Sequence, residues 1–206
     1  DVNKRRRQGI YVAGITSGAV VIAFEYGIEQ LALLWGVGNS ADDFEALPIE
    51  ERVLLPVLGA LALGIVFSLL KAEDREVGIV HVVSRLHRSY GMLPWRNAAV
   101  QFAGGALALA SGQSGGREGP GVHLGAAANS LLGQALGLPN NSLRVLIACG
   151  SAGGIAAAFN TPLAGVIFAM EVIVSEYTVA GFMPVMLSAV FACLFSVGVA
   201  ALLGLQ

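Results

Sequence analysis

The sequence predicts an all-α integral membrane protein built from tilted and broken helices. Three observations predict this fold class. Only 13% of the 206 residues are charged, about half the share found in soluble domains, and the mean hydropathy is +0.72. Hydrophobic residues make up 55% of the chain, more than the surface of a soluble domain of this size tolerates. The apolar residues form long runs that glycine and proline interrupt.

Three apolar runs are long enough to span a bilayer, which takes about 20 residues with some tilt. They cover residues 9–37, 53–70 and 180–205. Four shorter runs are bounded by glycine- or proline-containing breaks, and they cover residues 97–112, 120–138, 143–158 and 162–174. Non-helical backbone at membrane depth is tolerated only inside protein or beside a water-filled cavity. A succession of broken helices therefore favours a transporter or channel whose helix ends face a permeant ion.

The basic residues predict the orientation in the membrane. Four of them lie at 4–7, ahead of the first run, and five lie in the connection at 71–96. The loop at 38–52 carries only Arg52. By the positive-inside rule, the N-terminus and the 71–96 connection lie in the cytoplasm of a multi-pass protein of the plasma or inner membrane. The net charge of −2 says little about partners, because the charges lie in a few short loops, and we expect no nucleic-acid partner.

The stretch from Gly115 to Pro120 places one carboxylate, Glu118, at the glycine-lined start of a helix. Glycine lets the backbone approach a ligand closely, and Pro120 suits a first turn because it has no N–H to leave unpaired. The free N–H groups of a first turn, with the helix dipole behind them, attract anions. A carboxylate fixed there is a tethered anion that occupies the site or swings away, as a gate would.

Two other segments also suggest glycine-rich helix starts, around Gly78 and at 150–154. The second has neither the lysine nor the spacing of a phosphate-binding loop. We predict instead that Gly150, Gly153 and Gly154, like Gly121 and Gly125, let helices pack closely in lipid.

Polar residues inside the apolar runs leave two interpretations open. Glu25 and Glu29 share one helix face, and they are either buried acids paired with a neighbouring helix or members of a proton relay. His123 either hydrogen-bonds a neighbouring helix or relays protons. We favour the structural interpretation for both sites.

The remaining candidates predict no metal site and no cofactor. Cys149 and Cys193 lie in apolar runs without metal-ligand spacing, as small buried hydrophobes do. His81 and His87 belong to the basic connection, and we expect no specific role for them.

Two motifs carry a resemblance to a known family. They are GREGP at 116–120 and GIAAAFNTPLAG at 154–165, the latter continuing as VIFAME to residue 171. Their order and spacing resemble the CLC family of chloride channels and chloride/proton exchangers, which includes the voltage-gated chloride channels. The resemblance implies that residues 1–206 are the N-terminal half of a fold of two inverted repeats. A complete pore would need the C-terminal half, and the family forms homodimers in the lipid bilayer.

The resemblance also implies roles for single residues. Glu118 would be the gating glutamate, competing with chloride and carrying a proton when it leaves the pathway. The backbone N–H groups of Arg117, Glu118 and Gly119 would line the outer part of the ion path.

The central anion site departs from the family pattern. The family usually has Gly-Ser-Gly-Ile-Pro, whose serine hydroxyl coordinates the central chloride, and Val77 stands at the serine position here. Val80 replaces the proline, and Glu76 is placed to repel an anion near the inner vestibule. Anion binding would then depend on the N–H groups of Gly78 and Ile79, or on the missing half. This leaves a preference for fluoride or nitrate open.

The internal proton site departs as well. Exchangers of the family typically carry a glutamate directly after the position of Glu171, where this chain has Val172. We therefore expect glutamate-gated chloride transport that is channel-like or weakly proton-coupled. The alternatives are a tightly coupled chloride/proton antiporter and a non-conducting assembly half. An enzyme is not expected, because neither a nucleophile–base pair nor a metal cluster at helical spacing is found.

Overall fold

The computed structural model describes residues 2–36, 44, 47–174 and 179–203, and every regular element in that part of the chain is a helix. The elements are α1 (Val2–Leu34), α2 (Ile49–Leu69), the 3-10 turn η2 (Ala72–Arg75), α3 (Gly78–Arg88), α4 (Trp95–Ala110), α5 (Glu118–Ala135), α6 (Asn140–Phe159), α7 (Pro162–Phe168), the π-helical turn η3 (Ala169–Val174) and α8 (Val179–Leu203). The predicted all-α class is confirmed.

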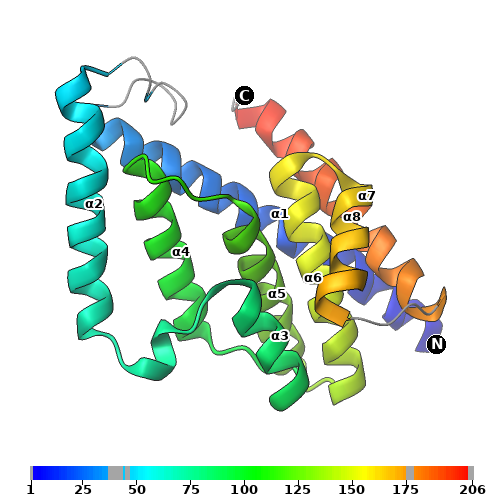
Figure 1. Ribbon diagram of the computed structural model, residues 1–206. Helices are drawn as coiled ribbons and strands as arrows, with labels where there is room; N and C mark the ends of the chain where they lie inside the picture. The colour runs from blue at the N-terminus through cyan, green and yellow to red at the C-terminus, as the bar shows by residue number, and fades with distance from the viewer. Residues whose placement is uncertain (1, 37–43, 45–46, 175–178, 204–206) are drawn as a thin grey trace.

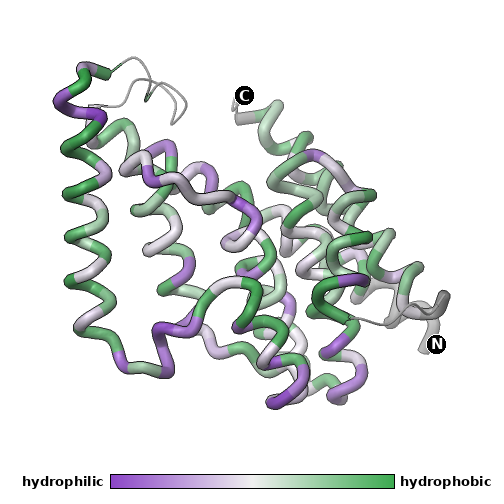
Figure 2. Tube along the Cα trace, in the orientation of Figure 1, coloured by the Kyte–Doolittle hydropathy of each residue, from purple (hydrophilic) through white to green (hydrophobic). Residues whose placement is uncertain are grey.

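The helices are tilted relative to one another rather than aligned in a parallel bundle. α1 and α8 run obliquely through the molecule, whereas α2 stands upright at one edge, next to α4 (Figure 1). Central α6 packs against α1, α5, α7 and α8. Among the described residues, four helical stretches are long and apolar enough to cross a membrane, namely Gly9–Leu34, Ile49–Leu69, Asn140–Phe159 and Gly181–Leu202. Figure 2 shows α2 and α8 as mostly hydrophobic and η2 as hydrophilic.

The helix breaks fall where glycine, asparagine and proline predict them. α4 ends at Ala110, and Gly112 follows with a φ of 75°. α6 begins after Pro139 and ends at Phe159, and its C-cap residue Asn160 has a left-handed backbone with a φ of 54°. Pro162 then opens α7, at a position where a missing N–H removes no helical hydrogen bond. The broken helices that the sequence predicts are therefore present, but the predicted helix start at 150–154 is wrong, because these residues lie inside the continuous helix α6.

α5 and α6 approach each other so closely that only glycine fits at their crossing. A Cβ atom on Gly125 would meet the carbonyl oxygen of Gly150, and one on Gly154 would meet the carbonyl oxygen of Gly121. In lipid, such close backbone packing is a main source of helix association. The predicted packing role of these four glycines is confirmed, and α5 is held against the central helix.

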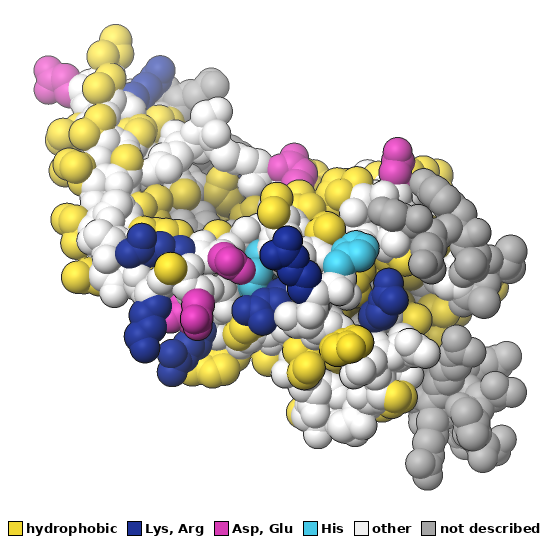
Figure 3. Space-filling view, turned by 60° about the horizontal axis from the view of Figure 1, so that its bottom comes forward, with side chains coloured by type: hydrophobic (Ala, Val, Ile, Leu, Met, Phe, Trp, Pro, Cys, Tyr) yellow, Lys and Arg dark blue, Asp and Glu magenta, His cyan; other side chains and the backbone are white. Residues whose placement is uncertain are grey.

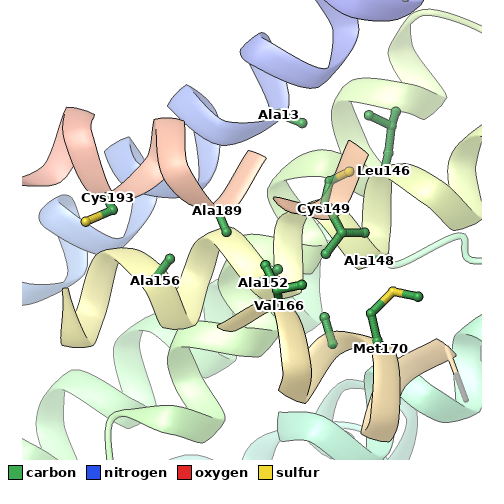
Figure 4. Close-up of a cluster of buried hydrophobic side chains, with 12 residues drawn as sticks. Ala13, Leu146, Ala148, Cys149, Ala152, Ala156, Val166, Met170, Ala189 and Cys193 are labelled. Atoms are coloured by element: carbon green, nitrogen blue, oxygen red, sulfur yellow. The ribbon is translucent and has the colours of Figure 1, made fainter. Parts of the chain in front are cut away.

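Small side chains fill the core on the other side of α6, as Figure 4 shows. Its buried members are Ala13, Leu146, Ala148, Cys149, Ala152, Ala156, Val166, Ala169, Met170, Val185, Ala189 and Cys193. The predicted burial of both cysteines is confirmed. Because most of these side chains are short, α1, α7 and α8 can all lie close to α6.

A buried polar cluster attaches α5 to α1. Asn129 of α5 donates hydrogen bonds to the Ser17 hydroxyl at 2.8 Å and to the Ala13 carbonyl at 3.2 Å. Asn129 and Ser17 are fully buried. With α6 on one side and α1 on the other, α5 is positioned firmly, and so is the residue at its start.

Candidate functional site

The start of α5 combines an exposed carboxylate with a glycine-rich approach. Glu118 is the first helical residue, and Gly121 N–H makes an early helical hydrogen bond, to the Arg117 carbonyl at 2.9 Å. The N–H groups of Glu118 and Gly119 belong to the first turn, which has no acceptors within the helix. The Glu118 carboxylate folds back over Gly116, so a side chain at position 116 would collide with it. Gly116 therefore leaves open the space that the Glu118 carboxylate occupies.

An ion pair attaches this helix start to α1. The guanidinium Nη1 of Arg117 lies 4.0 Å from a carboxylate oxygen of Glu25, and both side chains are partly exposed. This contact agrees with the interpretation of Glu25 as an acid paired with a neighbouring helix.

The start of α3 is built without any side-chain cap. Val77 is the N-cap residue, and Gly78 follows with a φ of 79°, which favours glycine. The Val77 side chain has no hydroxyl. At the predicted central anion site, α3 therefore presents the backbone N–H groups of Gly78 and Ile79 as hydrogen-bond donors. The preceding loop is held by Asn97 of α4, whose Nδ2 donates to the carbonyls of Glu73 and Glu76, both at 2.8 Å.

One cavity of about 280 Å³ is lined by residues from both helix starts, although Gly78, Ile79 and Glu118 are not among its lining residues. Val77 lines it from α3, and Gly116 and Pro120 line it from the start of α5. Leu63 and Phe67 of α2, with residues of α4, form the remaining wall. The structure thus brings the predicted central position and the predicted gate segment together, although they are far apart in the sequence.

The sequence analysis missed the polar group of this cavity. Gln101 of α4 is the polar side chain among the lining residues, and its amide oxygen lies 4.0 Å from where a Cβ of Gly78 would be. Gln101 and Asn97 are the polar residues within an otherwise apolar run, one helical turn apart. That spacing was a signal that could have placed both on the face toward α3.

The three histidines differ sharply in surroundings. His81 Nδ1 and His123 Nε2 are 2.9 Å apart, in the interior between α3 and α5. The expectation that His123 hydrogen-bonds a neighbouring helix agrees with this contact. The expectation that His81 has no specific role is wrong, because a turn of α3 carries it inward toward α5. Exposed His87 hydrogen-bonds within its own helix, to the carbonyl of Val83 at 2.8 Å.

The predicted internal proton position lies away from the cavity. Val172 and Glu171 occupy the π-helical turn η3 after α7, and both side chains are exposed. Neither residue is part of the cavity lining. Among the described residues, no group of three or more His, Cys, Asp or Glu side chains is arranged to hold a metal ion.

Basic side chains gather on one face of the molecule, which Figure 3 shows from below. Lys71, Arg75, Arg88 and Arg96 are exposed there, in or next to η2, α3 and the start of α4. This face coincides with the connection at 71–96 that the sequence analysis singled out by its charge.

Two helix starts that line one cavity, among broken and tilted helices of which four stretches are long and apolar enough to cross a membrane, define a multi-pass membrane protein of the broken-helix class. The sequence model of the family described as voltage gated chloride channel matches residues 58–204. The chain belongs to the CLC family of chloride channels and transporters.

Named relatives span the range from channel to exchanger. A Ralstonia nicotianae protein described as a ClcB-like chloride channel protein is 34% identical over 188 residues, covering 87% of this chain and 43% of that protein. The H(+)/Cl(−) exchange transporter ClcA of Vibrio cholerae is 44% identical over 108 residues, covering 50% of this chain and 23% of the relative.

Solved structures of transporters share the fold. A slow cyanobacterial Cl−/H+ antiporter superimposes with a TM-score of 0.70 at 25% identity, over 93% of this chain and 46% of the other. A CLC-type fluoride/proton antiporter superimposes with a TM-score of 0.71 at 26% identity, over 98% and 48%. The chain thus spans less than half the length of the relatives that it matches.

Proposed function

We propose that this chain forms the first half of an anion transport protein, with chloride as the transported ion and Glu118 as the gate. The observation that carries the proposal is the single cavity lined by the starts of both α3 and α5. Each start directs first-turn N–H groups and the positive end of a helix dipole outward, which favours a bound anion. No resident cofactor and no enzymatic step enters this proposal.

The proposed path has an outer and an inner part. The N–H groups of Arg117, Glu118 and Gly119 serve the outer part, where the Glu118 carboxylate competes with the anion. The N–H groups of Gly78 and Ile79 serve the inner part. Because Val77 contributes no hydroxyl, we expect weak anion binding at the inner part.

A second inverted repeat would complete the pathway. The chain covers 43% to 48% of relatives that align along most of it, which supports a missing second half. In this proposal both repeats of one protomer contribute to a single pore. Residues 1–206 by themselves therefore should not conduct. Anion flux through liposomes that contain only residues 1–206 would contradict this view.

The gate hypothesis predicts a change in pH dependence when Glu118 loses its charge. Glu118→Gln and Glu118→Ala in the full-length protein should conduct anions and lose the part of the pH dependence of flux that the Glu118 carboxylate contributes, because the tethered anion is gone. Chloride efflux from liposomes at several pH values measures this. Glu29→Gln, an intramembrane acid on α1, serves as the matched control and should retain the wild-type profile. Full pH dependence in both Glu118 variants would rule the gate out.

We further propose that transport is channel-like or weakly coupled, since Val172 cannot hold a proton. The tightly coupled antiporter is the competing proposal, and the exchangers among the relatives favour it. A chloride gradient should drive little uphill proton movement in liposomes of the wild-type protein. Val172→Glu should increase the protons moved per chloride, whereas Val174→Glu, two positions on, should not. Fixed-ratio proton uptake by the wild-type protein would overturn this proposal.

Fluoride is a second candidate ion, favoured by the absent hydroxyl at Val77 and by the likeness to a fluoride/proton antiporter. The same liposome assay decides between the ions when it is run with equal chloride and fluoride gradients. Faster chloride flux supports the main proposal, and fluoride flux that clearly exceeds it supports the second candidate.

We also propose a homodimer in the bilayer with a cytoplasmic N-terminus. Met183, Val190, Leu194 and Val197 are exposed along α8 at spacings that place them on one side of the helix. The basic face at 71–96 supports the orientation. Native mass spectrometry of the full-length protein tests the dimer, and labelling of a cysteine at Glu73 from either side of the membrane tests the orientation. A monomer mass or labelling from outside would contradict the respective proposal.

A further inference from the structure

A buried pair of histidines lies close behind both helix starts. His81 lies three residues after Gly78 in α3, and His123 lies five residues after Glu118 in α5. Nδ1 of His81 and Nε2 of His123 are 2.9 Å apart, and the two side chains are 3% and 0% exposed. The pair therefore joins the helix that begins at the inner anion position to the helix that begins at the gate.

The donors around the pair determine its tautomers. Arg85 Nε donates to His81 Nε2 at 3.2 Å, and arginine has only donors. The neutral His81 ring must therefore carry its proton on Nδ1 and donate it to His123 Nε2. His123 then carries its own proton on Nδ1, which has no hydrogen-bond partner among the described residues. Because burial disfavours a charged imidazole, this neutral arrangement is the state at neutral pH.

Glu76 offers the pair a different partner once a proton is added. Its Oε2 lies 3.9 Å from His81 Nε2, the same nitrogen that accepts from Arg85. An added proton binds Nε2, because Nδ1 already carries one. The cationic ring can no longer accept from Arg85 and is repelled by it, whereas a charge-assisted hydrogen bond to the Glu76 carboxylate becomes favourable.

Among the described residues, two charged groups act on His81. Arg85 and Glu76 are the charged groups that influence His81, and His81 itself influences His123 from across the α3–α5 contact. The turn η3 also packs against α3, but its acid, Glu171, is exposed. The exchange between Arg85 and Glu76 is therefore the local response to a bound proton.

We propose that the His81–His123 pair is a proton-binding site that makes anion transport depend on pH independently of Glu118. The inference rests on the proposed anion transport. Proton binding neutralises the influence of Glu76, which directly precedes Val77, and adds positive charge behind the start of α3. An anion is then held more favourably at the inner position, so acid raises the flux. The bound proton is returned when His81 again accepts from Arg85.

The test uses the full-length protein in a Glu118→Ala background, which removes the proposed gate. Anion flux from liposomes should rise ~3-fold or more as the pH falls from about 7.5 to about 4.5, a range that extends below the ordinary pKa of histidine because burial and Arg85 lower the pKa of His81. An added His81→Gln should abolish the rise, because an amide keeps hydrogen-bonding groups but does not titrate. His123→Gln should weaken the rise. The matched control is His87→Gln, which removes an exposed histidine of the same helix and should leave the rise intact.

Glu76→Gln provides a test that does not depend on altering the interior. Glu76 is 62% exposed, and this variant retains both histidines. It should raise the flux at neutral pH and reduce the rise at acid pH. If the response in Glu76→Gln and in any folded histidine variant equals that of His87→Gln, the proton-binding site is overturned. If the full-length protein with Glu118 intact shows no anion flux at all, the proposed function fails first, and the two failures are thereby distinguished.

Discussion

The two helix starts that meet in the cavity are held in place by different means. α5 packs backbone to backbone near its start, because Gly121 and Gly125 lie directly against the backbone of α6, and Asn129 further along adds hydrogen bonds to α1. α3 makes its fixing contacts through side chains, namely the Asn97 amide at the preceding loop and the histidine pair one turn further on. α5 also carries its own carboxylate, whereas α3 presents Val77 and bare backbone.

The start of α5 is therefore rigid, whereas the start of α3 can adjust its position. Glycine contacts between backbones leave no side chain to rearrange, so the start of α5 can move little without separating two helices. Hydrogen bonds from Asn97 and His81 can exchange partners at modest cost. We infer that regulated changes in the pathway occur at α3 and at the Glu118 side chain, while the α5 backbone serves as a fixed reference.

The largest effect should come from breaking the α5 contact. In Gly125→Leu the side chain would collide with the Gly150 carbonyl, and overpacking of this kind costs about 3 kcal/mol or more. The full-length protein in detergent should show a much lower unfolding temperature or fail to fold, and Gly125→Ala should show a smaller loss. Gly64→Ala on α2 is the control, because no atom lies within 4 Å of its Cβ position. Equal unfolding temperatures for Gly125→Ala and Gly64→Ala would show that α5 is not held by this contact.

An intermediate effect is expected at the loop before α3. Asn97→Ala removes both hydrogen bonds to the Glu73 and Glu76 carbonyls from a residue that is 1% exposed. Unpaired groups of this kind cost about 2 kcal/mol. Thermal unfolding should reveal the loss, and anion flux should fall because the inner N–H groups lose their position. Exposed Asn140→Ala should change neither quantity, and an Asn97→Ala protein with unchanged flux would contradict the positioning role.

The smallest effect concerns anion binding itself. Val77→Ser adds one hydroxyl at the start of α3, and a net gain of about 1 kcal/mol corresponds to ~5-fold tighter anion binding. The concentration dependence of chloride flux measures this, with Val80→Ser as the control for the same chemical change three positions on. A serine at an N-cap can also stabilise its helix. A higher unfolding temperature without tighter chloride binding would show that the hydroxyl caps α3 and does not contact the anion.

Local chemistry made part of this protein predictable from sequence. The apolar runs identified the membrane helices, because a helix in lipid must be apolar over its whole length. The breaks at Gly112, Pro139 and Asn160 followed from backbone preferences of single residues. The glycines of α5 and α6 were identified as packing positions for the same reason, since a small residue in an apolar helix has few other uses.

Contacts between segments that are distant in the sequence could not be predicted from local chemistry. His81 looked like part of a basic, solvated connection, and only the docking of α3 on α5 turned it toward His123. Gln101 received no role from the sequence, and the packing of α4 places it in the cavity, near Gly78. Both outcomes depend on which faces of two helices meet, and that choice is made by packing across the whole fold.

By itself, the sequence therefore determined the all-α membrane class, the helix breaks and the position of the carboxylate at the start of α5. These are properties of short segments, in which propensity and hydropathy act residue by residue. The tertiary structure decided that Val77 and Gly116 line one cavity and that two histidines share a buried hydrogen bond. The physical reason is that the crossing of two helices depends on how their two surfaces fit together. The sequence of either helix alone does not determine which of its faces meets the other.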